Sequence, residues 1–127
     1  MDFKDTQAIY LQIADFVCDN VVRGKWQEDG RIPSVRELGM QLEVNPNTVM
    51  RAYEWLQNQE IIYNKRGIGY FVCPSARQQI ISRQRKIFLE QELPEIFRRM
   101  QLLEIPVNEL SVRFESYRKR MSSSGTP

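Results

Sequence analysis

Hydrophobic residues recur at helical spacing near the start of the chain. Residues 6–23 are predicted to form an amphipathic helix, and Gly24 follows at the place of a left-handed C-cap residue. The apolar positions that set this period are Ile9, Ile13, Phe16, Val17 and Val21. Residues 27–31, which include Gly30, then read as a loop. The first helix is expected to pack beneath the helices that follow.

Residues 32–51 contain two helix starts separated by a single tight turn. Ser34 stands three residues before Glu37, the pattern of a capping box, so a helix is predicted from about Val35. Asn45 and Pro46 pair an N-cap residue with proline at the first helical position, which predicts a second helix. Its buried face is expected to hold Val49, Ala52, Tyr53 and Leu56, and its outward face Asn47, Thr48, Met50 and Arg51. This arrangement is typical of a helix-turn-helix, whose second helix, called the recognition helix, enters the DNA major groove.

A β-hairpin is predicted after the second of these helices. Two short β-branched and aromatic runs, residues 61–63 and 70–73, flank a turn with two glycines and a basic tip at Lys65 and Arg66. Pro74 closes the unit. Three helices followed by a hairpin have the order of a winged helix. We therefore expect an α+β fold in which residues 1–74 form a winged helix-turn-helix domain.

Residues 75–121 carry an apolar stripe at helical spacing that is interrupted at Pro94. Proline inside a helix removes a backbone hydrogen bond, so a kink or break is predicted near Glu92. After Pro106 the apolar residues are spaced alternately by three and four, which is typical of the seam of a helix that packs against another helix. Residues 122–127 are predicted to be a disordered tail.

The two C-terminal helices are too small to bury both apolar stripes by themselves. We expect them to form a short two-helix dimerisation segment that packs against the same region of a second chain with two-fold symmetry. The residues assigned to this contact are Ile80, Ile87, Phe88, Ile96, Phe97, Met100, Leu110, Phe114 and Tyr117. The alternative is an intramolecular hairpin that folds onto the winged helix.

Composition narrows the classes of protein. The chain has 127 residues, of which 42% are hydrophobic and 27% charged, as in a soluble globular protein with one domain or a small domain plus an appendage. No apolar run approaches the roughly twenty residues of a membrane span, and no signal peptide is expected. Cys18 and Cys73 lack metal-ligand spacing, so they are predicted to be reduced, buried thiols in the cytoplasm.

Catalytic chemistry finds no support in the sequence. The chain contains no histidine, no carboxylate pair at a catalytic spacing and no glycine-rich phosphate loop. We therefore expect no enzyme activity, no metal and no cofactor.

Charge is distributed unevenly along the chain. The net charge is +2, but residues 1–73 hold eight Lys and Arg against ten Asp and Glu, whereas residues 74–127 hold ten against six. A nucleic-acid-binding domain is usually basic as a whole. DNA binding must therefore depend on a few basic groups in and just after the motif, namely Arg36, Arg51, Lys65 and Arg66, and should weaken steeply with salt.

Four motifs are spaced along the first 72 residues. They are residues 9–13 (IYLQI), 32–38 (IPSVREL), 44–49 (VNPNTV) and 67–72 (GIGYFV). Together they resemble the DNA-binding domain of the GntR family of bacterial transcription regulators. The Asn-Pro-Asn-Thr start of the recognition helix and the tail of about fifty residues are most similar to the YtrA-type subfamily. That resemblance implies a winged-helix fold and a homodimer.

Two positions depart from the family pattern. Glu60 stands where the family usually has glycine, and a left-handed conformation there costs roughly 1 kcal/mol. Met50 stands where members with larger effector domains often have arginine. Base reading is therefore expected from Asn47 and Arg51.

The candidate DNA contacts lie at the helix starts and the hairpin tip. They are Ser34, Arg36, Asn45, Asn47, Thr48, Arg51, Lys65, Arg66 and Gly67. Asn47 and Thr48 can reach base edges or phosphates from the first turn of the recognition helix, although both have the alternative of only capping it. Arg51 can pair with guanine, with Glu54 or Trp55 as its alternative partner.

Contacts to the DNA backbone are expected from the flanking elements. Ser34 and Arg36 begin the helix that crosses the backbone, so they should contact phosphate, with capping alone as the alternative for Ser34. Resemblance to the family implies minor-groove or phosphate contacts for Lys65 and Arg66, and the alternative is a solvated turn. The basic runs at residues 83–86 and 118–120 are expected to be solvated faces, with phosphate contact as the alternative.

The expected function is transcription regulation. We predict a cytoplasmic homodimeric repressor that binds a palindromic double-stranded operator, one recognition helix in each half-site. The subfamily resemblance implies control of a transporter operon. The alternative is a winged-helix module that binds protein rather than specific DNA. A small effector at the dimer interface is a further hypothesis.

Overall fold

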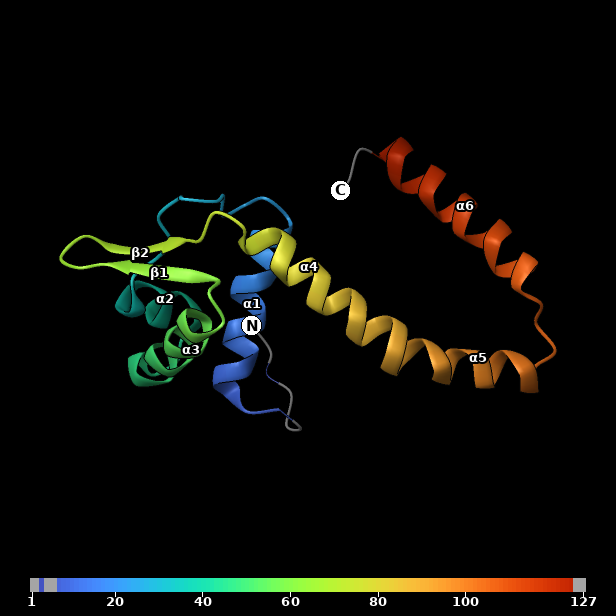
Figure 1. The fold of residues 1–127 in the computed structure, drawn as a ribbon, viewed down its shortest axis with the longest axis horizontal. Helices are drawn as coiled ribbons and strands as arrows, with labels where there is room; N and C mark the ends of the chain where they lie inside the picture. Colours follow the sequence, from blue (N-terminus) through green and yellow to red (C-terminus); the bar gives the residue numbers. More distant parts are fainter. Residues whose placement is uncertain (1–2, 4–6, 125–127) are drawn as a thin grey trace. The chain divides into compact units, whose positions relative to one another are not determined.

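The computed structural model describes residue 3 and residues 7–124, which divide into two compact units, one ending at Ser82 and the other starting at Arg83. In the first unit three helices precede the hairpin, which are α1 (Ile9–Val22), α2 (Val35–Leu42) and α3 (Pro46–Asn58) (Figure 1). Helix α3 packs against both α1 and α2. Gly24 follows α1 with a φ of 78°, which confirms the predicted left-handed C-cap.

The two predicted helix starts are confirmed by their caps. The Ser34 hydroxyl accepts from the Glu37 N–H at 3.0 Å, and the Glu37 carboxylate accepts from the Ser34 N–H at 2.9 Å. The Asn45 side chain accepts from the Asn47 N–H at 2.8 Å, which starts α3. Glu43 ends α2 in the left-handed region, with a φ of 57°, so the turn between the helices is short.

The core of the first unit forms on the predicted face of α3. Val49, Ala52, Tyr53 and Leu56 are all fully buried. The Tyr53 hydroxyl donates to the Pro33 carbonyl at 2.6 Å, and burial raises the pKa of this hydroxyl, so it remains a donor. Cysteines are free thiols, and Cys18 is buried as predicted while the Cys73 side chain is half-buried.

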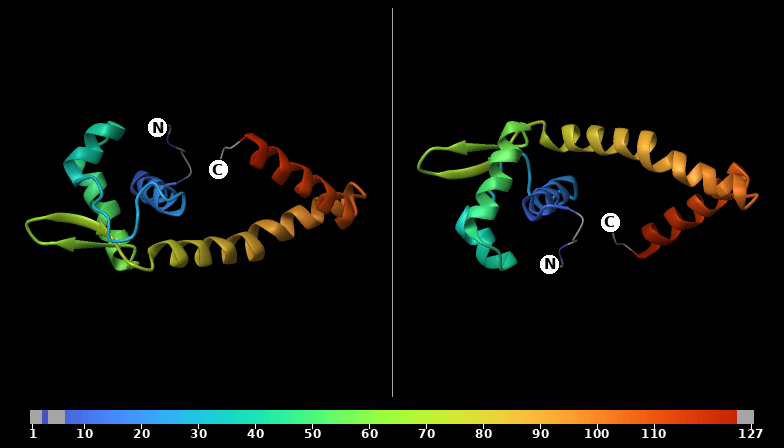
Figure 2. Two further views of the ribbon diagram at one scale, coloured as in Figure 1. Left: turned by 90° about the horizontal axis from the view of Figure 1, so that it is seen from above. Right: turned by 90° about the horizontal axis from the view of Figure 1, so that it is seen from below.

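The hairpin consists of β1 (Ile62–Lys65) and β2 (Gly69–Val72), paired antiparallel with Ile62 opposite Val72. Figure 2 shows it projecting beyond the helices of the first unit. A third segment pairs with β2, and it extends from the predicted loop to Ile32. The Asp29 N–H donates to the Val72 carbonyl at 2.8 Å, and the Ile32 N–H donates to the Tyr70 carbonyl at 3.0 Å. The hairpin is the wing of the winged helix, and its base therefore has three backbone segments.

Helix α4 (Ala76–Ile87) begins inside the first unit. Ala76 is fully buried, Ile80 is 3% exposed, and both belong to the core of the winged helix. The Arg77 side chain donates to the Val22 carbonyl at 3.0 Å at the end of α1. The assignment of Ile80 to a dimer contact is therefore wrong, because its side chain is already covered. The boundary at Ser82 lies later than the predicted one at residue 74.

The second unit is helical. A π-helical turn, η1 (Phe88–Glu92), is followed by α5 (Leu93–Leu102) and α6 (Val107–Ser124). The kink or break predicted near Glu92 is thus a change of helix type at residues 88–92. Pro94, which has no backbone N–H, is tolerated in the first turn of α5. Residues 122–124 are helical, so the prediction of disorder is wrong for them, and residues 125–127 lie outside the described residues.

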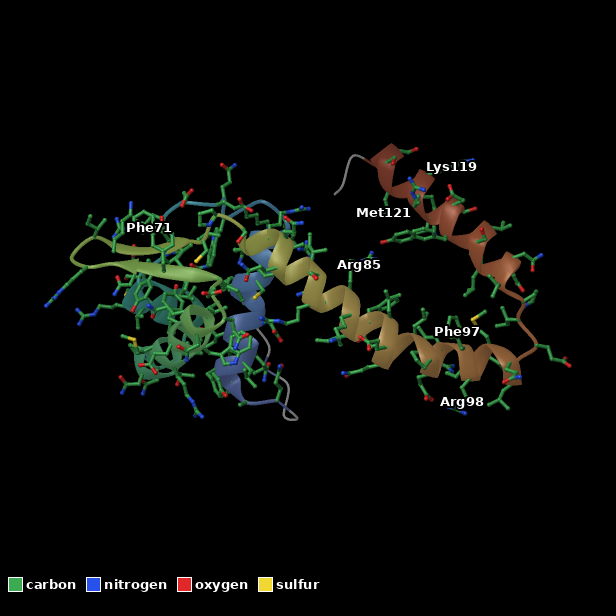
Figure 3. The ribbon with its side chains drawn as sticks, in the orientation of Figure 1. Phe71, Arg85, Phe97, Arg98, Lys119 and Met121 are labelled. Carbon is green, nitrogen blue, oxygen red and sulfur yellow. The ribbon has the colours of Figure 1, made fainter. Side chains whose placement is uncertain are left out.

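Most apolar side chains of the second unit are exposed. Phe97 and Arg98 lie on opposite sides of α5, as Figure 3 shows. Met100 differs from the rest of the predicted dimer stripe, because it is only 7% exposed within a single chain. Among the described residues, no helix has the length and apolar character needed to cross a membrane.

Candidate nucleic-acid interface

The first turn of α3 presents short polar side chains. Asn45 and Asn47 are exposed and Thr48 is half-buried. Asn45 holds the helix start through its oxygen, and that capping bond fixes the position of the turn. The N-terminal end of α3 therefore presents amide and hydroxyl side chains at the positive end of the helix dipole, a combination that suits base edges or phosphate oxygens.

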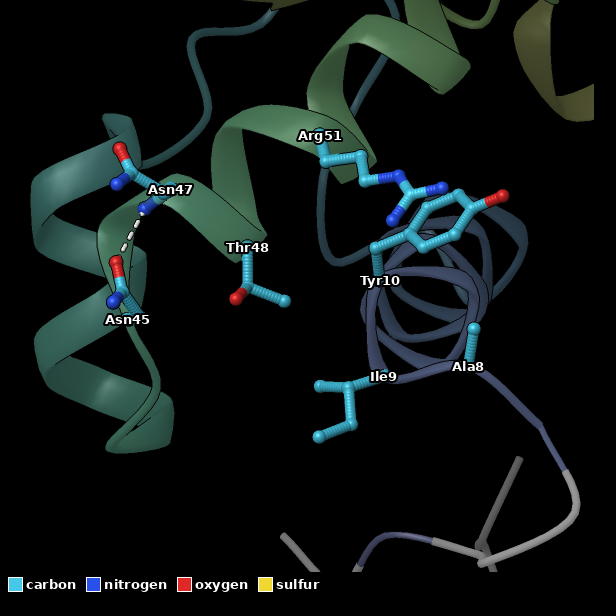
Figure 4. Close-up of a pocket in the computed structure, with 7 residues that line it drawn as sticks. All are labelled: Ala8, Ile9, Tyr10, Asn45, Asn47, Thr48 and Arg51. Carbon is cyan, nitrogen blue, oxygen red and sulfur yellow. Dashed lines mark hydrogen bonds between the residues drawn. The ribbon is translucent and has the colours of Figure 1, made fainter.

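Arg51, one turn further along α3, lies over the ring of Tyr10 from α1. The Cζ atom of Arg51 is 4.1 Å from the ring centroid, which is a cation–π contact (Figure 4). Sequence reasoning expected Glu54 or Trp55 as the alternative partner and gave Tyr10 no role. The pair borders a hollow of about 330 Å³ between the starts of α1 and α3, lined by Ala8, Ile9, Tyr10, Asn45, Asn47, Thr48 and Arg51.

The start of α2 adds two of the predicted contacts. The Ser34 hydroxyl takes part in the capping box, so its capping role is confirmed, and Arg36 is exposed beside it. The pKa of Glu37 lies below its usual value, chiefly because its carboxylate accepts a hydrogen bond from the Ser34 N–H. The Ser34 hydroxyl and the charge of Arg31 act in the same direction. Glu37 is therefore a carboxylate at neutral pH.

Arg31 is a basic residue that sequence reasoning did not assign to the interface. It is exposed and pairs with Phe71 in an isolated bridge beside the wing. A Cβ atom at Gly69 would lie 3.0 Å from the Arg31 side chain, so glycine leaves room for the guanidinium there. The sequence placed Arg31 at the end of the predicted loop, directly before Ile32. That position was the only sign of a role at the interface.

The wing tip holds Lys65, Arg66 and Gly67, all exposed. Gly67 has a φ of 79°, and the Ile68 N–H donates to the Lys65 carbonyl at 2.9 Å, so the turn requires glycine at this point. The Lys65 ammonium lies 4.6 Å from the centroid of the Phe71 ring. Its charge is therefore held above the hairpin strand, while Arg66 occupies the tip.

Tyr70 joins the wing to the recognition helix. Its ring packs edge-on against Tyr53, with 4.8 Å between the centroids, and its hydroxyl donates to the Met50 sulfur at 3.8 Å. Since Tyr53 is fully buried, this contact fixes the hairpin relative to α3. Recognition helix and wing thus form one surface. Among the described residues, no cluster of His, Cys, Asp and Glu is suited to hold a metal ion.

Comparison with known proteins agrees with this geometry. Residues 9–72 match the model of the family described as bacterial regulatory proteins, gntR family. YhcF of Bacillus subtilis, an HTH-type transcriptional regulator, is 39% identical over 58% of the chain and 61% of its own length, so the chain aligns with about three fifths of that relative. The HTH-type transcriptional repressor YtrA of the same organism is 31% identical over 72% of the chain and 70% of its own length.

Structural similarity extends over both units. A crystal structure of a transcriptional regulator of the GntR family from Bacteroides thetaiotaomicron is 47% identical, with a TM-score of 0.74, and covers 90% of the chain and 99% of the compared chain. The predicted winged helix followed by C-terminal helices is therefore confirmed. With its helix-turn-helix, wing and family match, the chain belongs to the GntR family of DNA-binding bacterial transcription regulators, and it resembles the YtrA-type members.

Proposed function

We propose that the protein is a cytoplasmic repressor that binds a palindromic operator as a homodimer, with α3 of each copy in the major groove of one half-site. The observation that carries this proposal is the fixed surface made by the polar first turn of α3 and the wing. Tyr70 couples the two elements through Tyr53 and Met50. A rigid surface of this kind positions several contacts on one duplex at once.

Each predicted contact has a separate role on this surface. Asn47, Thr48 and Arg51 read base edges from α3, with Asn45 at its cap. Ser34 and Arg36 at the start of α2 bind phosphate and fix the register. The wing residues Lys65, Arg66 and Gly67 contact the adjacent backbone or minor groove. All the basic groups named here are exposed, which supports this assignment despite the acidic balance of residues 1–73.

The second unit provides the dimer contact in this proposal. Its large apolar side chains are between 37% and 59% exposed at Ile87, Phe88, Ile96, Phe97, Leu110, Phe114 and Tyr117. On α6 they border an apolar hollow of about 510 Å³ lined by Val107, Leu110, Ser111, Arg113 and Phe114. A second copy of the same segment supplies a matching stripe at the same spacing, and two-fold symmetry then matches the palindrome.

The test measures two properties, the DNA sequence that the protein selects and its oligomeric state. Enrichment from random duplex DNA should yield a palindrome, and sedimentation of the full chain should give a dimer. Phe114→Glu, in the α6 stripe, should give a monomer with weakened operator binding. Val112→Glu is the matched control, because Val112 is 67% exposed on the same helix but lies off the stripe, and it should remain a dimer.

Two results would contradict the proposal. Failure to enrich any sequence would favour the alternative, a winged-helix module that binds protein, which the acidic balance of residues 1–73 supports. A Phe114→Glu variant that stays dimeric would place the dimer contact elsewhere. The hollow on α6 is also the place where a small apolar effector would bind, and calorimetry with candidate metabolites tests that part.

A further inference from the structure

We propose that Met50 is a specificity-determining residue that reads the C5-methyl group of a thymine in the operator. This inference rests on the proposed function, because it requires α3 to lie in the major groove. It adds an apolar reading element to the polar residues assigned above.

Met50 is an exposed apolar side chain among the polar residues Asn47, Thr48 and Arg51 of α3. Every residue of α3 is described, and its other large aliphatic side chains, Val49 and Leu56, are fully buried. Met50 instead is 39% exposed, one turn beyond Asn47 and next to Arg51. Covering this side chain with an apolar group of the DNA would remove apolar surface from water, which is favourable.

The side chain of Met50 is held from the wing side. The Tyr70 hydroxyl lies 3.8 Å from its sulfur, and Tyr70 is itself fixed edge-on against the buried Tyr53. Methionine is otherwise a flexible residue with three rotatable bonds. The sulfur contact restricts its conformations before DNA arrives, which lowers the entropic cost of a specific contact.

The chemistry of the major groove leaves one complementary base feature for such a group. Purine edges and cytosine present hydrogen-bond donors and acceptors there, whereas thymine adds the C5-methyl group. An apolar thioether gains by covering that methyl and loses by desolvating a polar edge. Met50 therefore selects thymine at one position of each half-site.

Deoxyuridine provides the test, because it keeps the thymine hydrogen-bonding pattern and lacks only the methyl group. The full chain is first used to enrich its site from random DNA, and each thymine of that site is then replaced by deoxyuridine in turn. One replacement per half-site should weaken binding of the wild-type protein by about threefold to fivefold. The same replacement should have no effect on Met50→Ala or Met50→Gln.

Met40→Ala is the matched control. Met40 is 76% exposed on α2, so it is a second exposed methionine of the first unit, and this variant should keep the full sensitivity to deoxyuridine. Two variants at Met50 guard against loss of folding in one of them, and circular dichroism confirms the fold of each.

The outcomes separate this inference from the proposed function. An enriched site with no methyl-sensitive thymine would overturn the inference alone, as would equal sensitivity in wild type and both Met50 variants. Failure to enrich any site would overturn the proposed function and the inference with it. Sensitivity that disappears with Met50 and persists in Met40→Ala would support the inference.

Discussion

The guanidinium of Arg51 lies over the ring of Tyr10, with the Arg51 Cζ atom 4.1 Å from the ring centroid. Tyr10 belongs to the first turn of α1 and Arg51 to α3, so the contact joins α1 to the recognition helix. Arginine loses considerable side-chain entropy when it is held in one orientation. By restraining Arg51 before DNA is bound, Tyr10 reduces the part of that cost that falls on binding.

Removing Arg51 or its support should weaken specific binding. Arg51→Ala is expected to cost about 1 to 3 kcal/mol of binding free energy and to relax the preference at one base. Tyr10→Leu should cost about 0.5 to 1 kcal/mol, the usual size of an exposed cation–π contact, whereas Tyr10→Phe should keep most of the affinity because the ring remains. Fluorescence anisotropy with operator and single-base variants measures both effects.

A double-mutant cycle shows whether Tyr10 acts through Arg51. In the Arg51→Ala variant, the further change Tyr10→Leu should cost little binding free energy, because the arginine that Tyr10 supports is gone. Additive losses would mean that Tyr10 contacts DNA or the core independently.

The wing should contribute without regard to sequence. Lys65→Ala is expected to weaken binding to all duplexes alike and to reduce the slope of log affinity against log salt by about one phosphate contact. Titrations of operator and scrambled DNA at several salt concentrations give both quantities. A loss confined to the operator would instead assign base reading to Lys65.

The capping box of α2 should make stability depend on pH. Bonds from Ser34 lower the pKa of Glu37 below its usual value of 4.5, so folding favours the ionised carboxylate. Its stabilisation is present above pH 4.5 and is lost as the pH falls below that value, through the lower pKa of the folded state. Glu37→Gln should therefore be less stable than wild type at neutral pH, and the difference should close in acid.

Urea unfolding at several pH values measures this difference. Ser34→Ala removes the other half of the box and should cost about 1 kcal/mol at neutral pH. A gap between wild type and Glu37→Gln that is the same at pH 3 and pH 7 would show that the ionised carboxylate has no part in the cap.

Glu60 offers a stabilising substitution. It has a φ of 60° at the end of α3, a left-handed conformation that disfavours a residue with a Cβ atom. Glu60→Gly should raise the free energy of unfolding by about 1 kcal/mol. Glu54→Gly, in the interior of α3, should lower it by a similar amount, because glycine is disfavoured within a helix. If both variants lose stability, the backbone at Glu60 is not strained.

Local signals in the sequence were sufficient for most of the first unit. The pairs Ser34 with Glu37 and Asn45 with Pro46 predicted both helix starts, because caps depend on residues a few positions apart. The period of Val49, Ala52, Tyr53 and Leu56 predicted the buried face of α3. The left-handed conformation of Glu60 agrees with the glycine that is usual at this place in the family, but the sequence of this chain left the geometry of the turn open.

Contacts between distant segments were not predictable in the same way. Pairing of Asp29 and Ile32 with β2 depends on where the hairpin lies in space, and residues 27–31 carry no strand pattern of their own. The Tyr10 contact with Arg51 depends on the packing of α1 against α3. Ile80 was placed in a dimer stripe because its helical spacing continues into that stripe, although the first turns of α4 pack on the winged helix.

The most direct test of the account is an anisotropy titration of the full chain with DNA from upstream of its own gene, at two salt concentrations. We predict saturable binding that exceeds binding to scrambled DNA and that weakens steeply at the higher salt, because a few placed cations contact phosphate. Absence of binding, or binding that salt leaves unchanged, would contradict recognition of DNA by α3 and the wing.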